Sequence, residues 1–201
     1  MAVNTGPVKS YLALGDSYTI GESVKKSERF PDQTTAFLNL AGIKVSAPEY
    51  IARTGWTTED LQEALNNSKL RPDYEIVSLL IGVNDQYQGM DTVGYRRRFT
   101  RLLEQAIRLG GEQAKHVFVL SIPDYSVTPF GRGDAKTRIA IDGFNSINKQ
   151  VALDYKVNFI DITPISRKAA TDQSLTANDG LHPSAKQYQE WALLLSAAIK
   201  Q

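Results

Sequence analysis

The chain has 201 residues, 42% of them hydrophobic, and its 23 Lys and Arg against 22 Asp and Glu give a formal charge of +1. This length and composition predict one domain spanning residues 1–201, and the near-zero charge offers no electrostatic basis for binding nucleic acid. Because the chain has no cysteine, disulfides, thiolate nucleophiles and Cys-ligated metal sites are excluded, so any nucleophile is an oxygen or a nitrogen.

Neither a membrane-spanning segment nor an export signal is evident in the chain as given. No window approaches the roughly 18 apolar residues of a transmembrane helix, and residues Met1 to Lys9 contain no apolar run resembling a secretory signal. We therefore expect a soluble chain without a transmembrane segment. Because an export signal that had been removed would leave no trace, the localisation stays open. The sequence does not predict the oligomeric state either.

Five short β-rich runs recur along the chain. A strand with one solvent-exposed face alternates apolar and polar residues, but most of these runs are continuously apolar. This pattern indicates parallel strands that are buried on both faces. The runs are Tyr11–Leu14, Tyr50–Ala52, Ile76–Ile81, Val117–Leu120 and Val157–Ile160.

Segments with helical spacing separate these runs. Thr57 and Asp60 resemble a capping box ahead of one predicted helix, and Ser184 suits the start of a last helix that ends near Lys200. Right-handed crossovers between parallel strands predict a three-layer α/β/α sandwich with a five-stranded parallel sheet. By analogy, we expect the flavodoxin-like strand order 2-1-3-4-5. The other helical segments contain Leu61 and Leu65, the run from Phe99 to Ile107 before Gly110, and Ile139 to Val151.

In such a sheet, ligands bind at the carboxyl ends of the strands, so the polar residues that follow strands are candidate site residues. Asp179 and His182, just before the last helix, join them. The segments selected by this rule are Gly15-Asp16-Ser17, Arg53-Thr54-Gly55, Gly82-Val83-Asn84-Asp85 and Pro123-Asp124.

Hydrolysis by a serine nucleophile also needs a base and oxyanion donors, and these segments contain candidates for all three. Ser17 is placed at a strand-to-helix turn, where amide groups favour developing negative charge. Of the two histidines, His116 begins a strand away from the crevice, whereas His182 lies at the correct end with Asp179 three residues earlier to orient it. The Gly55 N–H, the Asn84 side-chain amide and the Ser17 N–H are candidate oxyanion donors.

Together these segments resemble the successive blocks of the SGNH (GDSL-type) hydrolase family of esterases and lipases. The resemblance implies the SGNH fold, a Ser17–His182–Asp179 triad, an oxyanion hole of Ser17, Gly55 and Asn84, an acyl-enzyme intermediate, and no cofactor or metal. Tyr18 stands where the GDSL pattern has leucine, which bears on substrate fit. The blocks, within residues 11–183, are Gly15-Asp16-Ser17-Tyr18, Gly55, Gly82-Val83-Asn84-Asp85 and Asp179-Gly180-Leu181-His182-Pro183.

Each of these residues alone has an ordinary structural interpretation, as a helix cap, a turn residue or a surface histidine. Their occurrence together and in order favours catalysis. A rival is a metal-dependent phosphoesterase that uses Asp16, Asp85 and Asp124, with or without His182. A non-catalytic ligand-binding domain on the same fold is another.

The substrate is predicted only as a small-molecule carboxylic ester: a short-chain acyl ester, a lysophospholipid, a thioester or an acetylated carbohydrate. The run Arg96-Arg97-Arg98 is interpreted as a solvated helix surface, because consecutive residues spread around a helix. Candidates for lining the substrate pocket are Tyr18, Tyr87, Met90, Tyr125 and Phe130.

Overall fold

The computed structural model describes residues 6–201 and contains a five-stranded sheet in which all neighbouring strands are parallel. The spatial order β2-β1-β3-β4-β5 confirms the predicted flavodoxin-like order. The strands are β1 (Tyr11–Gly15), β2 (Glu49–Ala52), β3 (Ile76–Leu80), β4 (Val117–Leu120) and β5 (Asn158–Ile160).

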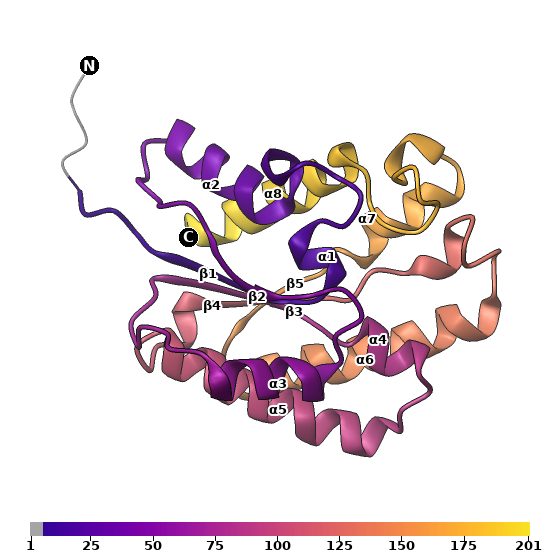
Figure 1. Cartoon of the computed structure of the whole chain (residues 1–201), viewed down its shortest axis with the longest axis horizontal. Coiled ribbons are helices and arrows are strands. Elements are labelled where there is room, and N and C mark those ends of the chain that lie inside the picture. Colours follow the sequence, from indigo (N-terminus) through magenta and orange to yellow (C-terminus); the bar gives the residue numbers. More distant parts are fainter. Residues whose placement is uncertain (1–5) are drawn as a thin grey trace.

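Helices cover both faces of this sheet, which confirms the three-layer sandwich. Figure 1 shows α2, α7 and α8 on one face and α3, α5 and α6 on the other. Two short helices, α1 and α4, directly follow β1 and β3. The helices are α1 (Ser17–Ile20), α2 (Phe30–Leu40), α3 (Thr58–Asn67), α4 (Val83–Tyr87), α5 (Thr92–Leu109), α6 (Ala135–Asp154), α7 (Thr163–Arg167) and α8 (Ala185–Ile199).

Burial differs between the centre and the edges of the sheet. Every residue of β1, β3 and β4 is buried, as expected for strands covered on both faces, whereas the edge strands β2 and β5 are partly exposed. Between α2 and α8, Trp191 packs on Tyr188 and Phe30, with ring centroids 5.2 Å and 6.2 Å away. These contacts fix α8, and therefore the segment just before it, against the sheet.

The helix starts follow the local capping chemistry. Thr57 and Asp60 form the predicted capping box of α3, and the Ser184 hydroxyl accepts from the Gln187 N–H at the start of α8. The sequence patterns did not predict helix α2. Its N-cap residue, Arg29, makes no side-chain capping hydrogen bond.

The strand order creates a topological switch point. After β1 the chain crosses to β2 through the α2 face, and after β3 it crosses to β4 through the α5 face (Figure 1). The loops that follow β1 and β3 therefore diverge and leave a crevice at the carboxyl ends of the strands. Within residues 6–201, no helix combines the length and apolar character that a membrane span needs.

Candidate active site

A chain of hydrogen bonds joins Ser17, His182 and Asp179 at the carboxyl edge of the sheet. Ser17 begins α1 immediately after β1, and its Oγ lies 3.0 Å from His182 Nε2. On the other side of the ring, Nδ1 lies 2.6 Å from Asp179 Oδ2. Ser17 and His182 are only 5% and 7% exposed. With Nδ1–H donating to the carboxylate, Nε2 is the acceptor for the serine proton, which is the arrangement of a general base.

Asp179 is held as an anion by four donors. Its Oδ1 accepts from the backbone N–H groups of Leu181 and His182, at 2.9 Å and 3.0 Å. Its Oδ2 accepts from His182 and also from the Ser23 hydroxyl, which is 2.6 Å away. Partial burial raises the pKa of this carboxyl, but the hydrogen bonds from Ser23, His182 and the backbone outweigh burial and hold the pKa well below its usual range.

The other histidine, His116, lies at the end of the sheet opposite Ser17, His182 and Asp179. It precedes β4 at the opposite end of the sheet, and its Nδ1 lies 2.9 Å from the Gly110 carbonyl oxygen. His182 is therefore the histidine in position to act on Ser17.

The three predicted oxyanion donors come from three separate loops. The Asn84 side-chain amide uses one N–H to donate to the Trp56 carbonyl at 2.9 Å, which orients the amide and leaves its second N–H for a ligand. Gly55, in the turn after β2, has φ of +81°, a conformation that favours glycine even though a Cβ there would meet no atom within 4 Å. The Ser17 N–H lies in the first turn of α1, where helical amides have no helical acceptor.

The turn that carries Asn84 requires glycine at position 82 for two reasons. Gly82 has φ of +124°, and a Cβ there would lie 2.2 Å from the hydroxyl oxygen of Tyr95. Tyr95 is fully buried and donates to Asn148 Oδ1 at 2.7 Å, so it has no room to move aside. The close packing of α5 therefore sets the backbone path of the Asn84 loop.

A buried carboxylate links the loops that carry Gly55 and Asn84, two of the predicted oxyanion donors. Asp85 accepts from the Thr58 N–H at 2.8 Å and from the Thr58 hydroxyl at 2.5 Å, and so ties the start of α4 to the start of α3. Arg98 donates to the Thr58 hydroxyl through Nε at 3.0 Å and to Asp85 through Nη2 at 3.4 Å. Burial raises the pKa of Asp85, while the hydrogen bonds from Thr58 and the charge of Arg98 oppose that rise.

This role of Arg98 corrects the interpretation of the arginine run. Arg96 and Arg97 are exposed as predicted, but the Arg98 side chain is only 13% exposed and turns inward. The sequence contains a signal that could have separated them, because Arg98 is one residue before the buried Phe99 and one turn after Gly94.

Asp16, next to Ser17, is fully buried, and only one of its two carboxyl oxygens has a hydrogen-bond partner among residues 6–201. Its Oδ1 accepts from the Tyr18 N–H at 3.0 Å, and its Oδ2 has no hydrogen-bond partner among residues 6–201. Burial raises the pKa of Asp16 to about 8, although the hydrogen bond from Tyr18 lowers it. At neutral pH this carboxyl is therefore mainly protonated, and it does not add a negative charge next to Ser17.

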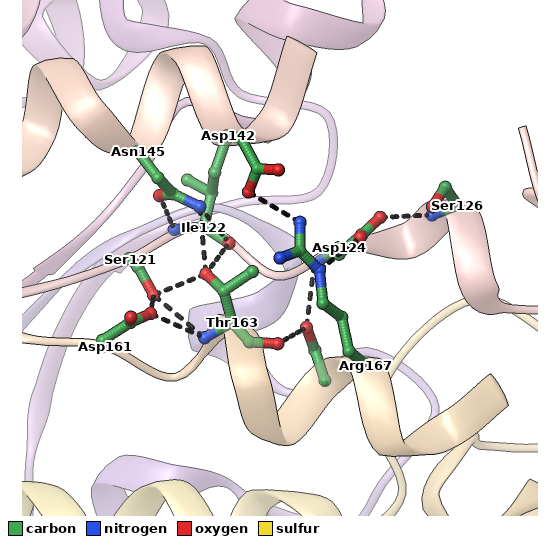
Figure 2. Close-up of polar contacts among 10 residues, drawn as sticks. Ser121, Ile122, Asp124, Ser126, Asp142, Asn145, Asp161, Thr163 and Arg167 are labelled. Carbon is green, nitrogen blue, oxygen red and sulfur yellow. Dashed lines mark hydrogen bonds and ion pairs between the residues drawn. The ribbon is translucent and has the colours of Figure 1, made fainter. Parts of the chain in front are cut away.

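Asp124 belongs to a different polar cluster, at the carboxyl end of β4. Figure 2 shows Arg167 reaching between Asp124 and Asp142, with N–O distances of 2.8 Å and 2.7 Å. The other Asp124 oxygen accepts from the Ser126 N–H at 3.0 Å. This cluster holds the start of the loop that carries Tyr125.

The three aspartates proposed for a metal site thus have separate partners: Asp16 caps α1, Asp85 holds Thr58, and Asp124 pairs with Arg167. Across residues 6–201, no group of three or more His, Asp and Glu side chains is placed to hold a metal ion. The observed geometry does not support the rival phosphoesterase.

A hollow of about 160 Å³ opens next to Ser17 and His182. The rings of Tyr87, Tyr125 and Phe130 lie 6.1–6.2 Å apart at this hollow, and Tyr18 packs on His182 at 5.0 Å. The lining residues are Ser17, Tyr18, Val83, Asn84, Tyr87, Tyr125, Phe130, Leu181 and His182.

The structure places four of the five predicted pocket residues at this hollow. The exception is Met90, whose sulfur lies 3.2 Å from Nη2 of Arg98 and which is not part of the lining. Val83 and Leu181 belong to the predicted residue blocks but were not predicted to line the pocket, although each is the immediate neighbour of a predicted site residue.

Comparison with known proteins shows that the chain matches one protein family and resembles many solved structures. A family model described as the GDSL-like lipase/acylhydrolase family matches residues 13–190. No curated protein matches the chain.

Solved structures are similar over nearly the whole chain. A lipase/acylhydrolase from Enterococcus faecalis has a TM-score of 0.75 at 23% identity, covering 96% of both chains. An acetyl xylan esterase from Geobacillus stearothermophilus has a TM-score of 0.72 at 18% identity, covering 98% of this chain and 96% of that one. A psychrotrophic esterase, EstA, from a Pseudoalteromonas species has a TM-score of 0.69 at 17% identity, covering 96% and 97%. At these identities the structures establish a shared fold.

Proposed function

Because this chain belongs to the GDSL-like lipase/acylhydrolase family and is a carboxylic ester hydrolase, we propose that it cleaves its ester in two steps through an acyl-enzyme on Ser17. The observation that carries this proposal is the hydrogen-bonded chain from Ser17 Oγ through His182 to Asp179, at 3.0 Å and 2.6 Å. The family match over residues 13–190 also supports treating the chain as one hydrolase domain.

In the first step, Ser17 Oγ attacks the acyl carbonyl carbon while its proton moves to His182 Nε2. The C=O electron pair shifts to the oxygen, and the tetrahedral intermediate then collapses. The alcohol leaves with the proton from Nε2, and the acyl group stays on Ser17. In the second step, water gives a proton to Nε2 and attacks the acyl-enzyme, after which Ser17 recovers its proton and the acid is released.

Asp179 supports both steps by electrostatics. Its carboxylate accepts from Nδ1 and stabilises the imidazolium that forms each time Nε2 takes a proton. The depressed pKa of Asp179 keeps it ionised over the whole range in which a histidine base functions. The protonated state of Asp16 at neutral pH prevents a second carboxylate from opposing the developing oxyanion.

The oxyanion is proposed to bind the Ser17 N–H, the Gly55 N–H and the free N–H of Asn84. Asn84 is well suited because its other N–H is already committed to the Trp56 carbonyl, so the amide is oriented before the substrate arrives. One such donor typically lowers the barrier by about 3 kcal/mol.

The hollow favours a short, uncharged group on the ester. Within residues 6–201, no Asp, Glu, Lys or Arg side chain lines it, and aromatic rings form much of its wall. Its volume of about 160 Å³ is close to that of a cavity of roughly 150 Å³ that accommodates one benzene molecule. We therefore propose short-chain acyl esters in preference to esters of long fatty acids.

The proposed mechanism is tested with wild type, Ser17→Ala and a control, Ser46→Ala, which alters an exposed serine before β2, at the end of the sheet opposite the site. Each protein is incubated with an aryl acetate and with a fluorophosphonate that labels activated serines. We expect hydrolysis and labelling in wild type and Ser46→Ala, and neither in Ser17→Ala. Equal hydrolysis or equal labelling of Ser17→Ala would overturn the assignment.

A panel of aryl esters of increasing acyl length tests the substrate class separately. We expect kcat/KM to be highest for acyl groups of a few carbons and to fall for long chains. A steady rise toward long-chain esters would contradict the proposed short-acyl preference without affecting the mechanism.

A further inference from the structure

Ser23 lies at the end of the segment that carries the nucleophile. Helix α1 ends at Ile20 with Gly21 as its C-cap, and the Glu22 N–H donates back to the Ser17 carbonyl at 3.0 Å, so the chain is tightly folded between Ser17 and Ser23. Ser23 has φ of +66°, in the left-handed region that a serine rarely adopts. Glycine would occupy this conformation without strain, so replacing Ser23 with glycine removes the side chain and the strain together.

The Ser23 side chain is hydrogen-bonded to the triad. Its Oγ donates to Asp179 Oδ2 at 2.6 Å, and the same oxygen accepts from His182 Nδ1 at 2.6 Å. The nucleophile segment therefore bonds the 179–182 segment at two places: Ser17 to the imidazole, and Ser23 to the carboxylate that orients it.

We propose that Ser23 is a positioning residue for ester hydrolysis, whose hydroxyl fixes the Asp179 carboxylate and shares the negative charge of the oxygen facing His182. This proposal rests on the proposed triad mechanism. Ser23 acts through Asp179 and does not line the hollow beside Ser17. Its effect is therefore expected in the ionisation of the base and in kcat, with KM little changed.

The direction of the effect on pH dependence follows from the shared oxygen. Without the Ser23 hydroxyl, Oδ2 carries more of its negative charge toward His182 and stabilises the imidazolium more strongly. The base then loses its proton at higher pH, so the acid limb of the kcat/KM profile moves to higher pH. Ser23 is exposed and the Asp179 side chain is 29% exposed, so water can partly replace the hydroxyl and the expected shift is about 0.5 pH unit.

Other titratable groups near the triad do not account for such a shift. Tyr18 packs on the imidazole, and burial holds its pKa well above its usual value, so it stays neutral. Asp16 is mainly protonated, and Asp124 is paired with Arg167. Two further titratable groups are Tyr125, whose pKa burial also raises, and Glu22, which accepts from the Thr54 hydroxyl. None of them contacts Asp179 Oδ2.

The test uses three substitutions that separate the hydroxyl from the strain. Ser23→Ala removes the hydroxyl and keeps a side chain in the left-handed conformation. Ser23→Gly removes the hydroxyl and relieves the strain, whereas Ser23→Thr keeps a hydroxyl but adds a β-branch that this conformation disfavours. For each variant, kcat and KM for an aryl acetate are measured against pH, together with the thermal midpoint.

We expect Ser23→Ala and Ser23→Gly to shift the acid limb upward by the same amount and to lower kcat severalfold, with KM nearly unchanged. Ser23→Gly should be the more stable of the two. Ser23→Thr should retain the wild-type limb although its thermal midpoint is the lowest. Activity and stability then change in opposite directions, which a merely structural role does not produce.

The proposal is overturned if Ser23→Ala and Ser23→Gly keep the wild-type acid limb, or if the limb follows the thermal midpoint across the three variants. Failure of the proposed mechanism is recognised separately. If Ser17→Ala retains esterase activity, the triad assignment fails; if Ser17→Ala is inactive and the Ser23 variants are unshifted, only the role of Ser23 fails.

Discussion

Replacing Asp16 with asparagine tests the physical interpretation of the buried acid beside the nucleophile. Asparagine preserves the Oδ1 acceptor for the Tyr18 N–H but cannot ionise. The wild-type carboxyl has an ordinary pKa of 3.8, which burial raises to about 8 in the folded protein. A raised folded-state pKa contributes stability that is complete below the unfolded pKa and is lost as the pH rises through the folded pKa.

The size of the effect follows from the same two values. Between about pH 4 and pH 8, the unfolded chain has lost the proton that the folded chain keeps, so the free energy of unfolding falls by about 1.4 kcal/mol per pH unit. By about pH 6 the loss amounts to roughly 3 kcal/mol. Asp16→Asn lacks this term, so its stability relative to wild type should increase by that amount between about pH 4 and pH 6.

The measurement is urea-induced unfolding of wild type and Asp16→Asn from about pH 4 to about pH 8. Taking the difference between the two proteins removes the contributions of the carboxyls that both contain. A difference that stays constant from about pH 5 to about pH 8 would refute the conclusion that Asp16 is protonated in the folded state.

Two further predictions concern the oxyanion loops. Asn84→Ala should lower kcat on the order of a hundredfold, about 3 kcal/mol in the barrier, with a smaller change in KM; steady-state kinetics on an aryl acetate check this, and a change confined to KM would contradict it. Arg98→Met leaves the buried Asp85 without its cation and should lower the free energy of unfolding by about 3 kcal/mol. Arg97→Met, on the exposed face of the same helix, should change the free energy of unfolding by less than about 0.5 kcal/mol in urea unfolding. Equal effects of the two substitutions would refute the conclusion that Arg98 stabilises the buried Asp85.

The fold was largely predictable because its signals are local. Continuous apolar runs predicted the buried strands β1, β3 and β4, and the capping residues Thr57 and Ser184 predicted where α3 and α8 begin. Helix α2 was missed because its start lacks a side-chain cap and its buried face includes Thr34 and Thr35. The family resemblance drawn from the residue blocks is confirmed by the family match over residues 13–190.

The sequence could predict the members of the candidate site that directly follow strands. Ser17, Gly55 and Asn84 each follow a strand, and parallel strands bring their carboxyl ends to one edge. The hydrogen bonds that join His182 with Ser17 and with Asp179 agree with the prediction that these residues lie together. Their catalytic roles, and the short-acyl substrate, stay proposals.

What the sequence by itself determined was therefore the parallel α/β sheet and the set of residues gathered at its edge, since both follow from short patterns of apolar and capping residues. Only the tertiary structure decided how side chains from distant segments pair. It turned Arg98 inward to Asp85, directed Met90 away from the hollow, left Asp16 buried without a counter-charge, and placed Ser23 on Asp179 across 156 positions of sequence. These outcomes depend on burial and on contacts between separate elements, which local patterns do not encode.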